Sequence, residues 1–498
     1  MPGSGLLLRI STFAARFARR IVGTDCVGSP YAASSFTACW RLVAALLLIS
    51  GWGPASAEAQ PPDLGTRHSG QDWPRFLGPT FDGKSPETGI RTDWSADRLP
   101  LVWTMAVGTS YGIGAVADGR YFQHERVGDF ERLRAVHAET GAALWQHDLP
   151  VSYTDLYGYN NGPRDTPAVA DDVVVTFGVA GRLSCRQVTD GSLRWTVETG
   201  PEYGVIQNFF GVGCSPLIHQ DKVIVMVGGS PPEDAAIPPG RLDRVSANGS
   251  AVVAFDIESG TEVWKTGDDL ASYSSPRLMT VDDTTLVLIF ARDGLLAVDA
   301  DSGEPRWHYP HRARLLESVN AMVPIVSGNR VLISECYEVG AVLLEIGRDG
   351  PREIWKDAPN RRLQAMRSHW STPILVDGWL YGCSGRNEPD SDLRCIGWED
   401  RARGWVDSRR SRSSLMYVDD HFVVLDESGL MQLIKADPTR FSPVTETHLE
   451  APTADRTAAG YLPLGRPYWA APTLSHGLLY VRGNDRVACF ELIPETTD

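Results

Sequence analysis

Hydrophobic and polar positions follow a recurring pattern along the chain, and the clearest copy covers residues 295–307. The apolar segment 295–299 is followed by the turn residues Asp301, Ser302 and Gly303, and then by a second short segment that ends in Trp307. Short apolar segments on both sides of a glycine-containing turn predict a β-hairpin. Residues 295–307 are therefore expected to form two antiparallel strands.

The same hairpin pattern recurs along most of the chain. Good copies cover 133–145, 183–195 and 252–264, each with glycine and tryptophan four residues apart, and looser copies cover 342–355, 393–405, 430–444 and 487–492. The tryptophans at 145, 195, 264, 307, 355 and 405 are separated by 50, 69, 43, 48 and 50 residues. Fixed repetition of one supersecondary unit at such periods is typical of a propeller, in which each repeat forms one blade.

A further pair of short strands is expected before each hairpin. In most copies the pair opens with a proline, which a strand tolerates at its first residue because no ladder hydrogen bond is lost there. These prolines are Pro167, Pro216, Pro276, Pro324, Pro373 and Pro472. Each unit therefore has four strands.

The last unit lacks a fourth strand, whereas an additional strand, 101–105 with Trp103, precedes the first unit. Pairing the two would close the ring and leave only short sheet edges. The predicted fold is all-β: an eight-bladed β-propeller of four-stranded antiparallel blades, closed by the N-terminal strand. The expected domains are an export signal with its n-region (1–59), an irregular N-terminal arm (60–99), the propeller (100–492) and a C-terminal tail (493–498).

Tryptophans of the repeats are expected to be structural, because a large aromatic ring at this position can pack between neighbouring blades. These docking residues are Trp103, Trp145, Trp195, Trp264, Trp307, Trp355 and Trp405.

Charge and the N-terminal sequence narrow the class of protein. The formal net charge of −15 disfavours nucleic acid and anionic membranes as partners, since both attract clustered positive charge. Several arginines, an apolar run at 42–49 and small residues around Ala57 and Ala59 are typical of an export signal; an uncleaved anchor is the alternative. We therefore expect an exported monomer, periplasmic or associated with the cell envelope, with no transmembrane span in the mature chain.

Six cysteines follow residue 59, and they show no spacing typical of a metal site. Cys383 and Cys395 are expected on consecutive strands of blade six. They are either a cross-strand disulfide or two small buried thiols.

Loop lengths indicate that one face of the ring carries the function. Connections such as 148–165, 199–213, 228–248, 309–320, 357–370 and 450–469 are much longer than a hairpin requires, and long loops in a compact domain are usually functional. Residues just before each innermost strand should then surround the mouth of the central channel. The candidates for binding a protein partner or a small polar or acidic ligand are Arg164, Asp165, Asn208, Asn320, Arg367, His369, Trp370 and Trp469. The alternative is that they only cap strands and satisfy loop backbone.

The element Ala-x-Asp-x-x-x-Gly-x-x-x-Trp, seen at Ala254–Trp264 and Ala297–Trp307, resembles the docking repeat of the PQQ-like (quinoprotein-type) propellers. The arm segment 73–79, Trp-Pro-Arg-Phe-Leu-Gly-Pro, is similar to a segment that precedes the ring in bacterial members. The resemblance implies either a quinoprotein dehydrogenase with PQQ and Ca²⁺ on the axis, or a cofactor-free scaffold of the BamB branch.

Features of the dehydrogenases are missing from this sequence. It has no adjacent Cys-Cys pair, and their calcium ligands and catalytic aspartate match no position. The resemblance therefore favours an exported, non-catalytic, BamB-like scaffold without catalytic residues, metal site or cofactor. A divergent PQQ- and calcium-dependent oxidoreductase, or a sugar-acting enzyme, is the alternative.

Overall fold

The computed structural model describes residues 61–95, 99–449 and 464–495. The chain divides into two units, Met1–Ala59 and Gln60–Asp498, and all described residues belong to the second. The predicted export signal thus lies outside the described residues. No helix among the residues described is long and apolar enough to cross a membrane.

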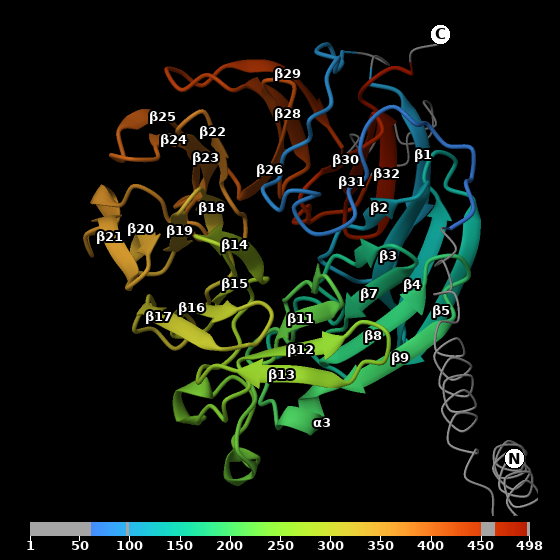
Figure 1. The fold of residues 1–498 in the computed structure, drawn as a ribbon. Coiled ribbons are helices and arrows are strands. Elements are labelled where there is room, and N and C mark those ends of the chain that lie inside the picture. Colours follow the sequence, from blue (N-terminus) through green and yellow to red (C-terminus); the bar gives the residue numbers. More distant parts are fainter. Residues whose placement is uncertain (1–60, 96–98, 450–463, 496–498) are drawn as a thin grey trace, which may run out of the picture. The chain divides into compact units, whose positions relative to one another are not determined.

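Eight four-stranded antiparallel sheets surround a common axis, as Figure 1 shows. The predicted all-β, eight-bladed fold is confirmed. Blade one consists of β2 (Ala115–Ala117), β3 (Arg120–Val127), β4 (Phe130–His137) and β5 (Ala143–Pro150). Blade two consists of β6 (Ala168–Ala170), β7 (Val173–Phe177), β8 (Arg182–Gln187) and β9 (Leu193–Glu198). Blade three consists of β10 (Leu217–His219), β11 (Lys222–Met226), β12 (Val252–Asp256) and β13 (Glu262–Thr266). Blade four consists of β14 (Arg277–Val281), β15 (Thr284–Phe290), β16 (Gly294–Asp299) and β17 (Pro305–Pro310).

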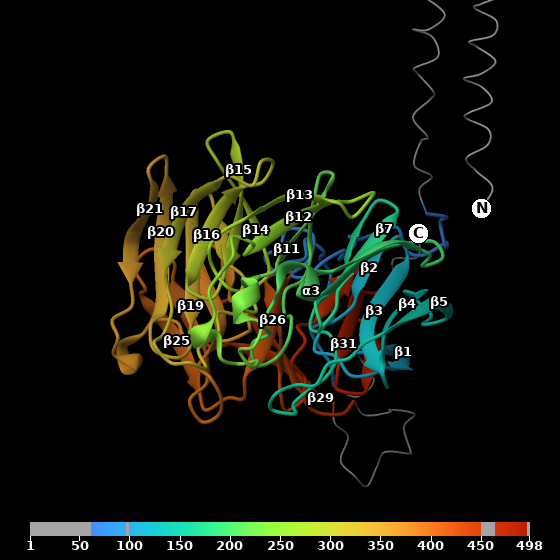
Figure 2. The same cartoon turned by 90° about the horizontal axis from the view of Figure 1, so that it is seen from below.

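The second half of the ring repeats this order, and Figure 2 shows blades four and five side by side. Blade five consists of β18 (Ile325–Ser327), β19 (Arg330–Glu335), β20 (Gly340–Gly347) and β21 (Gly350–Lys356). Blade six consists of β22 (Ile374–Val376), β23 (Trp379–Ser384), β24 (Asp392–Gly397) and β25 (Arg403–Ser408). Blade seven consists of β26 (Ser413–Val418), β27 (His421–Asp426), β28 (Leu430–Lys435) and β29 (Pro443–His448). Short helices α3 (Thr199–Tyr203), η2 (Pro232–Asp234), η3 (Leu242–Arg244) and η4 (Arg361–Leu363) lie in the long connections.

Blade eight joins the two ends of the propeller. It consists of β30 (Thr473–Ser475), β31 (Leu478–Arg482), β32 (Arg486–Glu491) and the N-terminal strand β1 (Leu101–Ala106). Strand β1 pairs antiparallel with β32, with Trp103 opposite Cys489. The predicted closure of the ring is confirmed.

Each docking tryptophan lies near the outer edge of its blade and contacts the hairpin turn of the next blade. Five of the seven indole N–H groups donate to a backbone carbonyl of that blade, at 2.7–2.9 Å: Trp103 to Ala138, Trp145 to Val188, Trp195 to Ile257, Trp355 to Trp398 and Trp405 to Asp437. The repeat glycine lies under the ring, so that a Cβ at Gly260 would come within 2.6 Å of Trp195. Trp145 and Trp307 are only half-buried.

Blade seven lacks a docking tryptophan, and the N-terminal arm supplies an aromatic ring there. Thr445 pairs with Leu433, the position that Trp405 holds opposite Cys395 in blade six. Trp94 of the arm is 3% exposed, and its backbone N–H donates to the Thr445 hydroxyl at 3.1 Å. It belongs to the apolar cluster that joins blades seven and eight.

The rest of the arm crosses the face of the ring on which the short first-to-second turns lie. Trp73 forms a bridge with Val116 of blade one, and Lys84 forms one with Tyr417 of blade seven. The Glu87 carboxylate accepts hydrogen bonds from the β30–β31 turn, including Gly477 N at 2.7 Å. Figure 1 shows this segment, in blue, near β2, β26 and β30. The arm therefore connects the first and last blades a second time.

All six cysteines of the described residues are buried free thiols. Cys383 pairs in register with Leu393, whereas Cys395 lies opposite Tyr381. The two thiols are thus not cross-strand partners, and the disulfide alternative is not realised.

Candidate functional site

A cavity of about 620 Å³ lies on the axis of the ring. All eight blades contribute to its wall, in each case with residues just before or at the start of the innermost strand: Tyr111–Ile113, Arg164 and Thr166, Gly213 and Ser215, Tyr273 and Ser275, Val319 and Ala321, His369–Thr372, Arg412 with Ser414 and Leu415, and Trp469–Ala471. Phe76 and Leu77 of the arm also line it. Because the arm crosses the short-turn face, we infer that the cavity opens on the long-loop face.

Aromatic rings and arginines dominate the cavity wall. The aromatic residues are Phe76, Tyr111, Tyr159, Phe210, Tyr273, Tyr337, Trp370 and Trp469. Three arginines, Arg164, Arg386 and Arg412, line the cavity, and no Asp or Glu side chain is among the lining residues described. The wall therefore favours a ligand with negative charge and flat or apolar surface.

Arg412 is held between two tryptophans. Its guanidinium carbon lies 4.2 Å from the ring centroid of Trp370 and 5.2 Å from that of Trp469. Behind it, Glu427 accepts hydrogen bonds from Arg412 Nη2 at 2.6 Å and from Trp469 Nε1 at 2.8 Å. Burial alone would raise the pKa of Glu427, but these two donors hold it below its usual value. Arg412 is thus fixed in place and its charge is already compensated.

Arg164 is also tied to its own loop. Its Nη2 donates to Asp155 Oδ2 at 2.8 Å and to the Asn160 carbonyl at 3.0 Å. The Asp155 carboxylate in turn accepts from the backbone N–H groups of Tyr157 and Tyr159, at 2.9 and 3.2 Å. This buried ion pair therefore fixes the shape of the loop between blades one and two.

Arg386 differs from the other two arginines of the cavity. It is exposed, and its guanidinium carbon lies 4.9 Å from the ring centroid of Tyr337. Within the described part of the chain, no carboxylate pairs with it and no group accepts a hydrogen bond from its side chain. Arg386 is therefore the cation of the wall that is available to a ligand.

His369 is neutral in this environment. Its shielded position, together with the nearby Arg412 and Arg386, lowers its pKa from the ordinary 6.5 to about 3. Nε2 lies 3.2 Å from the Tyr337 hydroxyl, while the buried Nδ1 has no partner among the described residues. A neutral imidazole can donate or accept a hydrogen bond, but it cannot act as a general acid at neutral pH.

Four of the eight predicted candidates line the cavity: Arg164, His369, Trp370 and Trp469. The expectation that the other four ring its mouth does not hold. Asp165 is buried, where it bonds His124 Nδ1 at 2.7 Å and the backbone of Phe177. The Asn320 side-chain amide donates to the backbone carbonyls of Ala291, Arg292 and His311. Asn208 is buried, and neither polar atom of its side chain has a partner among the described residues.

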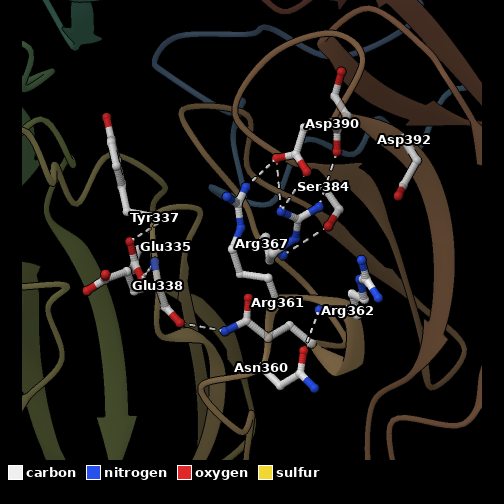
Figure 3. A network of polar contacts seen from close by, with 12 residues as sticks. Glu335, Tyr337, Glu338, Asn360, Arg361, Arg362, Arg367, Ser384, Asp390 and Asp392 are labelled. Atoms are coloured by element: carbon white, nitrogen blue, oxygen red, sulfur yellow. Dashed lines mark hydrogen bonds and ion pairs between the residues drawn. The ribbon is translucent and has the colours of Figure 1, made fainter. Parts of the chain in front are cut away.

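Arg367 was expected on the cavity mouth, but it is buried in the connection before β22, beside Ser384 and Asp390, as Figure 3 shows. It is 6% exposed, and its Nη1 lies 2.9 and 3.1 Å from the two carboxylate oxygens of Asp390. Its backbone N–H donates to the Ser384 hydroxyl at 3.0 Å. Asp390 lies six residues beyond the end of β23, and Arg367 is not among the residues that line the cavity.

Sequence reasoning did not name several wall residues, among them these five: Tyr159, Phe210, Tyr337, Arg386 and Asn387. Tyr337 lies in the β19–β20 connection, and Arg386 and Asn387 lie in the β23–β24 connection. The connection between the second and third strands of a blade lies on the same face of the ring as the connection to the next blade. Including those connections in the candidate set would have found three of the five.

Comparison with known proteins places the chain among the propellers of PQQ-like repeats. A family model described as outer membrane protein assembly factor BamB matches residues 100–230 and 129–383, which together span more than half of the chain. The chain belongs to this family. No curated protein sequence matches the chain.

Three solved structures illustrate the likeness. A europium-containing methanol dehydrogenase has a TM-score of 0.62 at 12% identity, covering 85% of this chain and 98% of its own. Quinohemoprotein alcohol dehydrogenase from Comamonas testosteroni has a TM-score of 0.58 at 13% identity, covering 86% and 82%. BamB from Moraxella catarrhalis has a TM-score of 0.49 at 15% identity, covering 80% and 99%. At identities this low, the two dehydrogenase structures show a likeness of fold alone.

The residues of the cavity do not fit Ca²⁺. This ion takes six to eight oxygen ligands, normally including carboxylates, and the described wall carries three arginines and no carboxylate. The acids bonded to wall residues, Asp155 and Glu427, already pair with Arg164 and Arg412. No cluster of three metal-ligating side chains occurs among the residues described. We therefore derive no redox step through PQQ and calcium.

Proposed function

We propose that this protein is an exported, non-catalytic, BamB-like scaffold of the cell envelope that binds an anionic group of a ligand or partner in the axial cavity. The observation that carries the proposal is the cavity wall itself: three arginines, eight aromatic rings and no carboxylate. Arg164 and Arg412 are compensated by Asp155 and Glu427, so Arg386 supplies the positive charge of the wall. A carboxylate bound there would gain charge-assisted hydrogen bonds, and its apolar part would stack on the rings.

The side chains of the wall support binding rather than catalysis. His369 has a pKa of about 3, so its imidazole is neutral and only weakly basic at neutral pH. Burial raises the pKa of the Tyr111 and Tyr273 hydroxyls above their usual value, which keeps them protonated. Arg164 and Arg412 are neutralised by their own carboxylate partners. The two tyrosines are therefore not prepared to act as nucleophiles near pH 7, and His369 is a weaker base than an ordinary imidazole.

Ligand-observed NMR would test the proposal. Phenylacetate should show saturation transfer from the protein, whereas phenylacetamide, which has the same shape but no charge, should show much less. Arg386→Ala should weaken the phenylacetate signal. Equal signals for acid and amide would contradict the proposal, as would reduction of a dye by the protein with PQQ, Ca²⁺ and an alcohol or sugar.

A further inference from the structure

An exposed aromatic patch adjoins the axial cavity on the long-loop face. It consists of Leu156, Tyr157, Tyr159 and Phe210, and the first three are 51%, 52% and 66% exposed. The ring centroids of Tyr157 and Tyr159 lie 5.8 and 6.1 Å from that of Phe210. Tyr159 and Phe210 also line the cavity. The patch and the cavity are therefore one continuous surface.

Hydrogen bonds of the backbone hold the patch in its exposed shape. Asp155 is 3% exposed and anchors the loop through the N–H groups of Tyr157 and Tyr159, while Asn161 Oδ1 accepts from Asp155 N at 2.7 Å. Phe210 N donates to the Tyr273 hydroxyl at 2.9 Å. Large apolar side chains kept in water on a fixed loop are typical of an interaction site, since a partner that covers them has little ordering cost to overcome.

We infer that the occupant is a segment of a partner polypeptide that combines an acidic residue with aromatic or aliphatic ones. The inference rests on the proposed function, and it names the occupant of the same site. The acidic side chain would enter the cavity and pair with Arg386. The apolar side chains would cover Tyr157, Tyr159 and Phe210.

Size and charge support a polypeptide over a small molecule. A cavity of about 620 Å³ is filled by one drug-sized ligand, but Leu156 and Tyr157 lie outside the cavity wall and would stay exposed with such a ligand bound. An extended chain with alternating acidic and apolar side chains can cover both parts at once. Among the three arginines of the described wall, Arg386 has no carboxylate partner, so an acidic side chain of the occupant would supply one.

Selection from a random decapeptide library displayed on phage would test the inference on the full chain. Enriched peptides should contain Asp or Glu within a few residues of an aromatic or aliphatic side chain. Binding of one enriched peptide, labelled with fluorescein, is then measured by fluorescence anisotropy. Arg386→Glu should weaken it about tenfold or more, Arg386→Lys much less, and the double variant Tyr157→Ser with Tyr159→Ser about fivefold or more.

Matched controls should change the affinity by less than twofold. Arg440→Glu reverses an exposed charge in the β28–β29 turn on the opposite face, and Val263→Ser removes an exposed apolar side chain from β13. All variants change exposed side chains, and thermal unfolding should confirm that each is folded.

The outcomes separate the inference from the proposed function. Enrichment of peptides without acidic residues, no enrichment, or an Arg386→Glu variant that binds like the parent would overturn the polypeptide inference. If phenylacetate still binds while no peptide does, the anionic site stands and only the inference fails. If neither phenylacetate nor any peptide binds, both fail.

Discussion

Tryptophans occupy two layers of this propeller, one near its rim and one on its axis, and their surroundings differ. At the rim, Trp195 is 8% exposed and its indole N–H donates to the Ile257 carbonyl of the next blade. On the axis, Trp370 is half-buried, stacks on Arg412, and has an indole N–H without a partner among the described residues. The same side chain thus joins two blades at Trp195, whereas Trp370 packs against Arg412 in the cavity wall. We expect substitutions at the rim to affect stability and substitutions on the axis to affect binding.

Deletion of residues 60–106 should give the largest effect. It removes the arm and β1, so blade eight loses its outer strand and blade one loses contact with Trp103. We expect the variant to fail to fold, or to melt more than about 10 °C below the parent, because the ring is no longer closed. Circular dichroism during heating would measure this. Unchanged melting would contradict the role of β1 in closure.

Single docking tryptophans should come next. Trp195→Ala and Trp264→Ala should each lower the free energy of unfolding by about 3–5 kcal/mol, as is usual for large buried aromatic residues. Trp307→Ala should lower it less, because Trp307 is half-buried and a Cβ at Gly350 would still be 3.7 Å away. Trp469→Ala on the axis should have the smallest effect of the four. Urea unfolding is the measurement, and equal losses at all four positions would remove the distinction between rim and axis.

The rim could be predicted from the sequence because its determinants are local. The clearest repeats contain a glycine, a tryptophan four residues later and, in most of them, a proline before the first strand. The spacing of these residues along the chain predicts the number of blades, the order of strands and the closure of the ring. The axis depends on which loop side chains pair with each other. Arg367 lies before β22, and Arg386 lies just after β23. Nothing in the order of residues shows that Asp390 pairs with Arg367 and that Arg386 stays unpaired.

Trp94→Ala tests a part of the rim that the repeat pattern does not contain. Because Trp94 is 3% exposed and lies against Thr445, where blade seven lacks its own tryptophan, its loss should lower the free energy of unfolding by about 3 kcal/mol. Val444→Ala, at an exposed position of β29 next to Thr445, is the control. A Trp94 variant as stable as the parent would show that the arm does not contribute to the docking layer.

Arg367→Ala separates structure from binding within blade six. The substitution leaves Asp390 with Arg361 alone, so we expect a loss of about 1–3 kcal/mol in the free energy of unfolding. Arg386→Ala should cost less than about 0.5 kcal/mol, because that side chain is exposed. Binding of phenylacetate should show the reverse order. A stable Arg367→Ala variant that no longer binds the probe would mean that Arg367, after all, contacts the ligand.

Lowering the pH should destabilise the folded protein because of His369. The folded protein holds this imidazole at a pKa of about 3, below the ordinary 6.5, because of its shielded position and the nearby Arg412 and Arg386. Between those two values the unfolded chain binds a proton that the folded protein does not. Stability from this group is therefore fully present above pH 6.5 and is lost progressively as the pH falls.

His369→Gln removes that proton linkage. Urea unfolding at pH 7 should show the variant less stable than the parent, since the contact with the Tyr337 hydroxyl is weakened. At pH 4.5 the difference should shift by about 3 kcal/mol in favour of the variant, because only the parent has an imidazole that takes up a proton on unfolding. His448→Gln, at an exposed position of β29, is the matched control. If the stabilities of parent and His369→Gln differ by the same amount at both pH values, the imidazole on the axis is not held neutral by its neighbours, and the contrast between rim and axis must be drawn without it.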